Sequence, residues 1–210
     1  MAIFLIRHAE TTLNAQRIVQ LPGTPLSERG LRQASCLGQR LAGSDIARIL
    51  TSDYTRAQMT SEKVADATGA AIEIVETLRE RNFGDVRGRS YSEIGDIFAE
   101  QYVPPAGESW ETFFERTDRS WETVQKVAGE TTGNLAVVTH GLVCYAYARR
   151  NLRVQKSDPL SPGAFANTSL TVVESHPPFR VELLGCTAHL DAEREQDDLS
   201  KLHRTQDSVC

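Results

Sequence analysis

Two histidines, two arginines and one glutamate in this sequence have the side chains that phosphoryl transfer needs. Arg7 and His8 stand together near the N-terminus, and Arg56, Glu80 and His140 follow along the chain. Imidazole is a competent nucleophile at neutral pH, because the pKa of histidine is about 6.5 and the ring is then largely neutral. Guanidinium groups bind phosphate oxygens through paired hydrogen bonds, and a carboxylic acid can protonate a leaving alkoxide and later activate water. These residue types together predict transfer of a phosphoryl group.

This chemistry does not require a metal ion, because arginines and a second histidine can stabilise the charge on the equatorial phosphate oxygens. The sequence contains no H-E-x-x-H pattern, no Asp-rich loop and no Walker pattern. Its four cysteines are far apart and form no C-x-x-C pair, which argues against a thiolate metal site or a disulfide framework. We therefore predict no metal, no cofactor, and a reduced, cytoplasmic setting.

The candidate residues follow predicted strands, and this placement would bring them together. His8, Ser52 and His140 each come directly after a short apolar run rich in β-forming residues. In an open α/β sheet, ligands bind beyond the carboxyl ends of the strands. We therefore expect these polar groups to meet at one edge of a sheet. The three predicted strands are Ala2–Arg7, Ile46–Thr51 and Asn134–Thr139.

Arg56 falls in the first turn of a predicted helix over residues 53–68. A cation in that position opposes the helix dipole, which favours anions at the N-terminal end. Its presence is easier to understand if a bound anion is shared between the guanidinium and the helix N-terminus. The alternative is a surface ion pair between Arg56 and Glu80.

Strands that alternate with helices predict a three-layer α/β sandwich with a mostly parallel central sheet flanked by helices. The pattern Ser90-Tyr-Ser-Glu93 has the form of a capping box and predicts a helix that ends near Tyr102. Alternating residues over 168–174 and 180–184 predict an antiparallel pair. The other predicted elements are helices over 27–41, from Ser109 onward and over 142–152, and a strand over 72–75.

The chain has 210 residues, which suits one domain, and we assign it to residues 1–190. Residues 191–210 are rich in charge and poor in large apolar groups, so we expect a polar C-terminal tail that is frayed or disordered. A net charge of −5 and the lack of a basic stripe argue against a nucleic-acid partner. The apolar run Ala2–Ile6 is too short for a signal-peptide core or a membrane span, so we expect no membrane partner.

Five short motifs occur in an order that is typical of one family. They are RHAETTLN (7–14), TPLSERG (24–30), TSDYTRAQMT (51–60), LRERNFGDVRG (78–88) and VVTHG (137–141), with NTSLT and TAHL near the end. The first resembles the signature R-H-G-E-T-x-x-N of the histidine phosphatase, or phosphoglycerate mutase-like, superfamily. The resemblance extends over about residues 3 to 190 and implies a phosphoglycerate mutase-like fold.

The resemblance also implies a role for each candidate residue. His8 would be the nucleophile and form a phosphohistidine, and Glu80 would act as acid and base. Arg7, Arg56 and His140 would bind the phosphate. Three further residues would contact the substrate, namely Asn14, Gln20 and Gly141.

Departures from the family pattern lie at the expected substrate rim. Ala9 stands in place of a usual glycine, Val86 and Arg87 replace the usual W-E, and Gly23 stands where aspartate is common. The substrate is therefore not predicted. Asn14 has an alternative interpretation as an ordinary helix cap. Four arginines near Glu80 are either solvated loop charges or a rim that attracts anionic substrates: Arg79, Arg81, Arg87 and Arg89.

The predicted function is a metal-independent phosphomonoesterase that acts on a small phosphorylated metabolite. The alternative is a phosphoglycerate mutase, whose relatives carry a longer insertion with a tandem arginine pair that can hold a carboxylate. Here Gly88–Ser109 contains one base, Arg89, against four acids, which favours access of water and hydrolysis. An inactive binding module is the third option, and the presence of His8, Arg56 and His140 opposes it. The predicted partner is a small phosphomonoester, and a homodimer is one option that the sequence leaves open.

Overall fold

Six strands form one central sheet in the order β3-β2-β4-β1-β5-β6. They are β1 (Ala2–Arg7), β2 (Ile46–Thr51), β3 (Ala71–Ile74), β4 (Asn134–Thr139), β5 (Leu170–Glu174) and β6 (Val181–Cys186). The computed structural model of the chain describes residues 1–155 and 160–191. Strands β3, β2, β4 and β1 are parallel, and β5 is antiparallel to both β1 and β6. The predicted mostly parallel sheet and the predicted antiparallel pair near the end are both confirmed.

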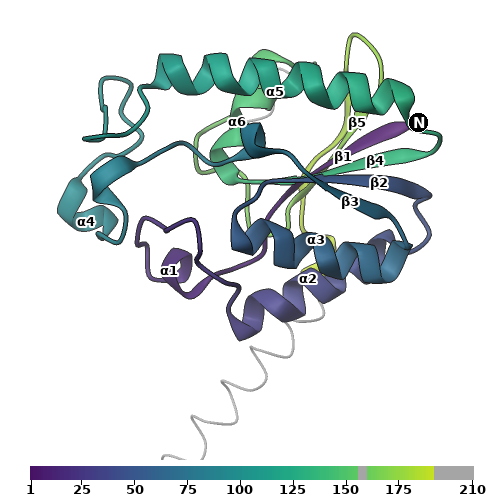
Figure 1. The fold of residues 1–210 in the computed structure, drawn as a ribbon, viewed down its shortest axis with the longest axis horizontal. Helices are drawn as coiled ribbons and strands as arrows, with labels where there is room; N and C mark the ends of the chain where they lie inside the picture. The colour runs from purple at the N-terminus through teal and green to yellow at the C-terminus, as the bar shows by residue number, and fades with distance from the viewer. Residues whose placement is uncertain (156–159, 192–210) are drawn as a thin grey trace, which may run out of the picture.

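Helices cover both faces of this sheet (Figure 1). Helices α2 (Glu28–Leu41) and α3 (Thr55–Thr68) pack on one face, and α5 (Trp110–Glu130) and α6 (Gly141–Arg150) pack on the other. Two short helices, α1 (Thr12–Ala15) and α4 (Tyr91–Ile94), lie beyond the carboxyl ends of β1, β2 and β4. Single 3₁₀ turns occur at η1 (Glu76–Leu78), η2 (Gly84–Val86) and η3 (Ala188–Leu190). The predicted three-layer α/β sandwich is confirmed.

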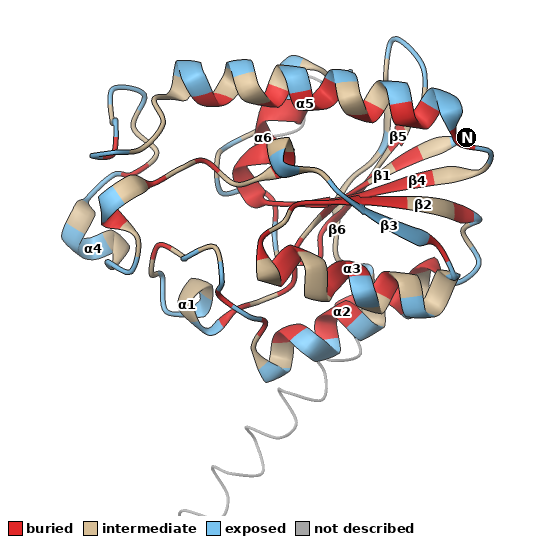
Figure 2. Ribbon diagram, viewed as in Figure 1, coloured by how far each residue is buried: buried red, intermediate tan, exposed pale blue. Residues whose placement is uncertain are grey.

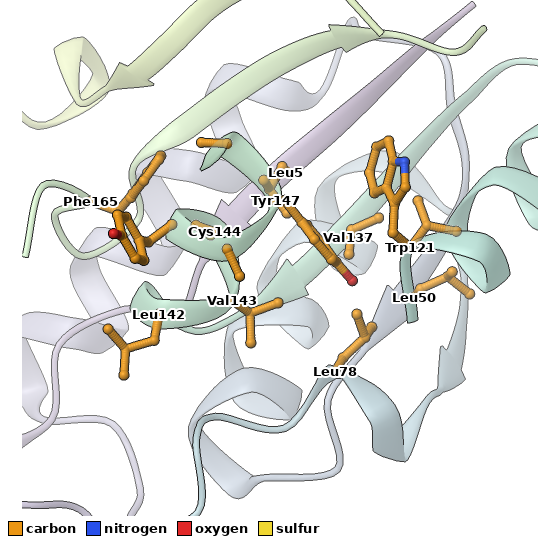
Figure 3. Close-up of a cluster of buried hydrophobic side chains, with 14 of the residues drawn as sticks. Leu5, Leu50, Leu78, Trp121, Val137, Leu142, Val143, Cys144, Tyr147 and Phe165 are labelled. Carbon is orange, nitrogen blue, oxygen red and sulfur yellow. The ribbon is translucent and has the colours of Figure 1, made fainter. Parts of the chain in front are cut away.

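The parallel strands are apolar on both sides because each side is covered by helices. In β4, Val137 belongs to the hydrophobic cluster under α5 and α6, whereas Val138 belongs to the cluster over α2 and α3. Buried residues accordingly run through the centre of the sandwich (Figure 2). Figure 3 shows Trp121 of α5 and Tyr147 of α6 packed among side chains of the first cluster, including Leu5 and Val137. This core holds the carboxyl ends of the strands at one edge.

The helix boundaries follow local signals in most places. Ser27 and Ser109 are N-caps whose hydroxyls accept hydrogen bonds from backbone amides, as predicted. Ser90 also opens a helix through a capping box, but the expected end near Tyr102 is wrong, because α4 ends at Ile94. Gly95 follows with φ 89° and ψ −144°, a conformation that other residue types rarely adopt. The backbone then leaves the helix.

The predicted polar tail over residues 191–210 falls almost entirely outside the residues that the structure describes. Asp191 is described, whereas residues 192–210 of the predicted tail lie outside the described residues. Over the two described ranges, none of the helices has the length and apolar character needed to cross a membrane.

Candidate active site

Three neighbouring strands deliver the polar residues that the sequence singles out. His8 follows β1, Ser52 follows β2 and His140 follows β4, and the sheet places these strands side by side. The amide of His8 donates to Thr139 O at 2.9 Å, so the strand pairing continues into the site. The ring centroids of His8 and His140 lie 5.2 Å apart. The expected meeting of strand ends at one edge is confirmed.

His8 is 1 % exposed, and its hydrogen bonds define its tautomer. Its Nδ1 lies 2.7 Å from Ala9 O, and a carbonyl can only accept, so Nδ1 carries the proton. Nε2 therefore holds a lone pair, and it accepts from Arg56 Nε at 3.2 Å. Burial, together with the charges of Arg56 and Arg7, lowers the pKa of His8 well below its ordinary value. The ring is thus held neutral, with Nε2 available as a nucleophile.

Arg56 occupies the first turn of α3 and is 2 % exposed. Its Nη1 donates to Leu21 O at 3.0 Å, and its guanidinium lies 5.0 Å from the centre of the Tyr54 ring. Burial lowers its pKa to about 10, so the group remains charged at neutral pH. The alternative of a surface pair with Glu80 is wrong, because Arg56 is buried and its hydrogen bonds go to His8 and Leu21.

Two buried nitrogen atoms at this edge have no protein partner within residues 1–155 and 160–191, namely Arg7 Nε and His140 Nδ1. Arg7 Nη1 donates to Phe165 O at 2.5 Å, and His140 Nε2 lies 2.9 Å from Ser52 Oγ. If Ser52 donates its hydroxyl proton, His140 Nδ1 carries the ring proton and is a donor. Buried polar atoms nearly always find a partner. A bound anion would satisfy both.

Glu80 lies in the loop after η1, opposite these cations. Its Oε1 accepts from the Arg81 amide at 2.9 Å, and its Oε2 accepts from the Leu142 amide at 3.2 Å, in the first turn of α6. Burial raises the pKa of Glu80, although the two amides and the charges of Arg56 and Arg7 act in the opposite direction. A carboxyl group whose pKa is raised retains its proton to higher pH, which suits a general acid.

The loop that carries Glu80 is held by an ion pair between Arg116 of α5 and Glu108, which precedes that helix. Arg116 donates to Thr77 O at 2.9 Å, to Arg79 O at 2.8 Å and to Glu80 O at 3.2 Å. Its guanidinium also forms a two-fold pair with Glu108, with both bonds at 2.8 Å. Glu108 Oε2 in turn accepts from the Asn82 amide at 2.7 Å. The backbone on both sides of Glu80 is therefore fixed by charged, partly buried groups.

A cavity of about 270 Å³ opens above these residues. Asn14, Gln20 and Gly141 all line it, together with Arg7, Arg56 and Glu80. Asn14 is not the N-cap of α1, which is Thr11, but it completes the capping box from the third helical position and donates to Asn167 Oδ1 at 3.1 Å. Gln20 Oε1 accepts from Thr11 Oγ1 at 2.6 Å. A Cβ at Gly141 would lie 3.4 Å from Arg7 Nε, in van der Waals contact with that guanidinium.

Comparisons with known proteins agree with this geometry. The family model described as "Histidine phosphatase superfamily (branch 1)" matches residues 3–184. The chain belongs to this superfamily. A relative named "Probable phosphoglycerate mutase GpmB" from Yersinia pestis (strain Pestoides F) is 39% identical over 90 residues, which is 42% of each chain. The match thus spans less than half the length of the curated relatives.

Solved structures extend the likeness over nearly the whole histidine phosphatase domain. Bacillus stearothermophilus YhfR is 30% identical with a TM-score of 0.76, and the match covers 90% of this chain and 99% of that one. The α-ribazole phosphatase from Shigella flexneri is 24% identical with a TM-score of 0.75, covering 90% and 98%. Below 25% identity, this second likeness shows the fold alone. The predicted phosphoglycerate mutase-like fold is confirmed.

Several residues of this histidine phosphatase site are not predictable from the motifs. Ser52 was placed at the sheet edge by the sequence, but its contact with His140 was not predicted, and Tyr54, which contacts Arg56, was visible only as a neighbour of Arg56. Arg17 lines the cavity from the turn after α1 and Tyr91 lines it from α4, beyond the motifs that carry the resemblance. Within the described part of the chain, no group of three or more His, Cys, Asp or Glu residues is placed to hold a metal ion.

We expect Glu80→Gln to slow the reaction of alkyl phosphates by about 100- to 10,000-fold, because glutamine cannot protonate the departing alkoxide. An activated aryl ester such as p-nitrophenyl phosphate needs little protonation, so its kcat/KM, which reports the phosphorylation step alone, should change by less than about tenfold. The pKa of Glu80 is raised above its ordinary value of 4.5. We therefore expect wild-type kcat/KM for alkyl phosphates to fall as pH rises through this raised pKa, because Glu80 then loses the proton that it must donate. The lowered pKa of His8 keeps the nucleophile neutral below 6.5. Steady-state rates against pH, for both substrates and both proteins, measure these effects.

An equal loss of kcat/KM for alkyl and aryl substrates in Glu80→Gln would contradict the assignment of Glu80 as the acid, because this quantity does not include the later attack by water. Glu93→Gln is the matched control, since Glu93 lies on the exposed side of α4 and pairs with Arg89.

Proposed function

We propose that this protein is a phosphomonoesterase that works through a phosphohistidine on His8 and needs no metal ion. The observation that carries the proposal is the neutral His8 ring, whose Nδ1–H bonds to Ala9 O and whose Nε2 lone pair meets Arg56. Membership of the superfamily supports a phosphatase or mutase activity. The similar proteins include one named as a probable mutase and one named as a phosphatase, so the choice between these activities rests on the residues of this chain.

In the first step, the substrate phosphate takes the donors of Arg7, Arg56 and His140. The bond from Arg56 to His8 is replaced by a bond to a phosphate oxygen, which frees Nε2. Nε2 then attacks phosphorus, the bond from phosphorus to the ester oxygen breaks, and Glu80 transfers its proton to that oxygen. The alcohol leaves, and the phosphorylated ring keeps its Nδ1–H on Ala9 O.

In the second step, water takes the place of the alcohol. The ionised Glu80 accepts a proton from water as the oxygen attacks phosphorus, and the bond from phosphorus to Nε2 breaks. Inorganic phosphate leaves, and both His8 and Glu80 return to their starting protonation states. Each proton is therefore moved by the same carboxyl group, which the Arg81 and Leu142 amides hold in place.

Access of water distinguishes the phosphatase from the mutase. A mutase must keep its phosphohistidine until an acceptor alcohol binds. The segment over residues 88–109 lacks a tandem arginine pair, and it contributes Tyr91 and Phe98 to the lining of the cavity. This arrangement favours hydrolysis over transfer to a second hydroxyl group.

We expect the phosphorylated enzyme to lose its phosphate in water alone at least as fast as the steady-state turnover. The physical reason is that Glu80 can activate water as soon as the alcohol has left. Rapid quench of enzyme labelled with a ³²P ester, with and without 3-phosphoglycerate and in excess EDTA, measures the decay.

A phosphoenzyme that persists for minutes in buffer and collapses only with 3-phosphoglycerate, yielding 2-phosphoglycerate, would instead identify a mutase. Loss of all activity in EDTA that a divalent ion restores would contradict the metal-independent mechanism. Label that maps to a residue other than His8 would contradict the phosphohistidine.

A further inference from the structure

The cavity that Arg7, Arg56 and Glu80 line holds more positive charge than one phosphate group can balance. Among the residues that line it, five are arginines and one, Glu80, is acidic. Arg7 and Arg56 would face the transferred phosphate. Arg81 is 1 % exposed, and its guanidinium already donates hydrogen bonds to backbone carbonyls. Two arginines therefore remain at the mouth, Arg17 and Arg87.

The four arginines near Glu80 separate into different environments. Arg79 forms an ion pair with Asp53, and Arg89 forms one with Glu93. Arg81 donates to the backbone carbonyls of Ile97, Tyr102 and Glu108. These three are structural charges. Only Arg87 matches the expectation of a rim that attracts anionic substrates.

Arg87 and Arg17 are each held by a tyrosine. Arg87 Nη2 donates to Tyr54 Oη at 3.3 Å, which directs the guanidinium along the cavity wall. Arg17 lies with its guanidinium 5.6 Å from the centre of the Tyr91 ring. Neither arginine forms an ion pair with any residue that the structure describes. One hydrogen bond from Arg87 and one ring contact of Arg17 leave most of the guanidinium donors of both residues available for a ligand.

Arg17 also has a backbone conformation that its residue type seldom adopts. Its φ is 57°, in the left-handed region, where glycine or asparagine costs less. Its carbonyl accepts from the Tyr91 amide at 2.9 Å, which fixes the turn after α1 against α4. The turn therefore presents a long cation at the cavity mouth.

We propose that Arg17 and Arg87 form a second anion subsite, and that the substrate is a phosphomonoester whose alcohol carries a carboxylate or a second phosphoryl group. This inference rests on the proposed function, because it takes the transferred phosphate to lie between Arg7 and Arg56. The alcohol part then extends toward the mouth, where its anionic group meets the two free guanidinium groups. A neutral alcohol of the same shape would leave both charges unpaired.

Binding to the His8→Ala protein tests the proposal, because that variant should leave each ester intact. Isothermal titration with 3-phosphoglycerate and glycerol 3-phosphate compares two esters that differ chiefly in a carboxylate against a hydroxymethyl group. We expect 3-phosphoglycerate to bind on the order of tenfold or more tightly, because charge-assisted hydrogen bonds are stronger than neutral ones. Glycerol 1,3-bisphosphate forms a third arm, which shows whether a phosphoryl group serves as well as a carboxylate. The preference should shrink as salt rises, since the mouth is exposed.

Arg17→Gln and Arg87→Gln, each combined with His8→Ala, should reduce the preference for the doubly anionic esters by on the order of tenfold, with glycerol 3-phosphate little affected. Arg89→Gln is the matched control, because Arg89 pairs with Glu93 and does not line the cavity. Equal affinities for all three esters, or an unchanged preference in both arginine variants, would overturn the second subsite while leaving the phosphate site intact. Failure of every ester and of inorganic phosphate to bind would instead contradict the proposed function.

Discussion

Replacing His8 with alanine is expected to reduce turnover by on the order of 10,000-fold or more, because no other group can form the covalent intermediate. The Nε2 atom of His8 is held with its lone pair beside Arg56, and its Nδ1–H is fixed on Ala9 O. His140 cannot replace it, since His140 Nε2 already bonds to Ser52. Phosphate release from wild type and His8→Ala, together with acid-labile label on the protein, measures the effect.

His176→Ala is the matched control for this experiment, because His176 is exposed and lies in the turn between β5 and β6. Thermal melting of both variants shows whether the fold is retained. Turnover by His8→Ala within about tenfold of wild type would contradict the nucleophile, since such a small loss is far below the effect of removing a covalent catalyst.

Replacing Arg56 with alanine is expected to lower kcat by about 100- to 1,000-fold, equivalent to about 3–4 kcal/mol of transition-state stabilisation. Arg56 carries its full charge at neutral pH, and its position in the first turn of α3 places that charge beside His8 Nε2. Because charge spreads over the phosphate oxygens as the bond to the alcohol breaks, the loss should appear in kcat more than in KM. Steady-state kinetics with one alkyl and one aryl ester measure both quantities.

Arg56→Lys separates charge from geometry, because lysine keeps the charge but lacks the planar pair of donors. We expect it to recover only part of the lost activity. Arg48→Ala serves as the control, since Arg48 lies on β2 and pairs with Glu73 at an exposed position. An Arg56→Ala protein that melts normally and keeps more than about a third of wild-type activity would contradict the role in phosphate binding, given the loss expected for a preorganised donor.

Much of the fold could be predicted because its signals are local. Ser27, Ser90 and Ser109 mark the starts of helices through their own hydroxyls, and the apolar runs of β1, β2 and β4 coincide with their predicted ranges. The end of α4 was wrong because one glycine, Gly95, outweighs the helical pattern that follows it. Helix α1 was missed because four residues are too short for a periodic pattern.

The candidate site was likewise predictable from the sequence only in part. His8 and His140 were predictable, because each directly follows a strand and the sheet order then brings the two together. The identity of Glu80 came from a family motif, whereas its position depends on Arg116, which lies 36 residues further along the chain. The distinction between Arg87 and Arg89 was also beyond the sequence. Both are basic residues of one loop, and only the folded chain shows that one has a carboxylate partner.

The bonds made by Arg81 and Arg116 bear on how this enzyme can diverge. Together they reach six carbonyl oxygens of the main chain, three from each arginine. Every amino acid supplies a carbonyl, so the bonds from Arg81 to Ile97 and Tyr102 place no demand on the residue type at these two positions. Phe98 lies between them and lines the cavity, so it can change during evolution while these bonds persist, whereas Ile97 is constrained by its burial in the core. A cavity-lining side chain can thus vary without loss of the bonds that hold the acid in register with the nucleophile.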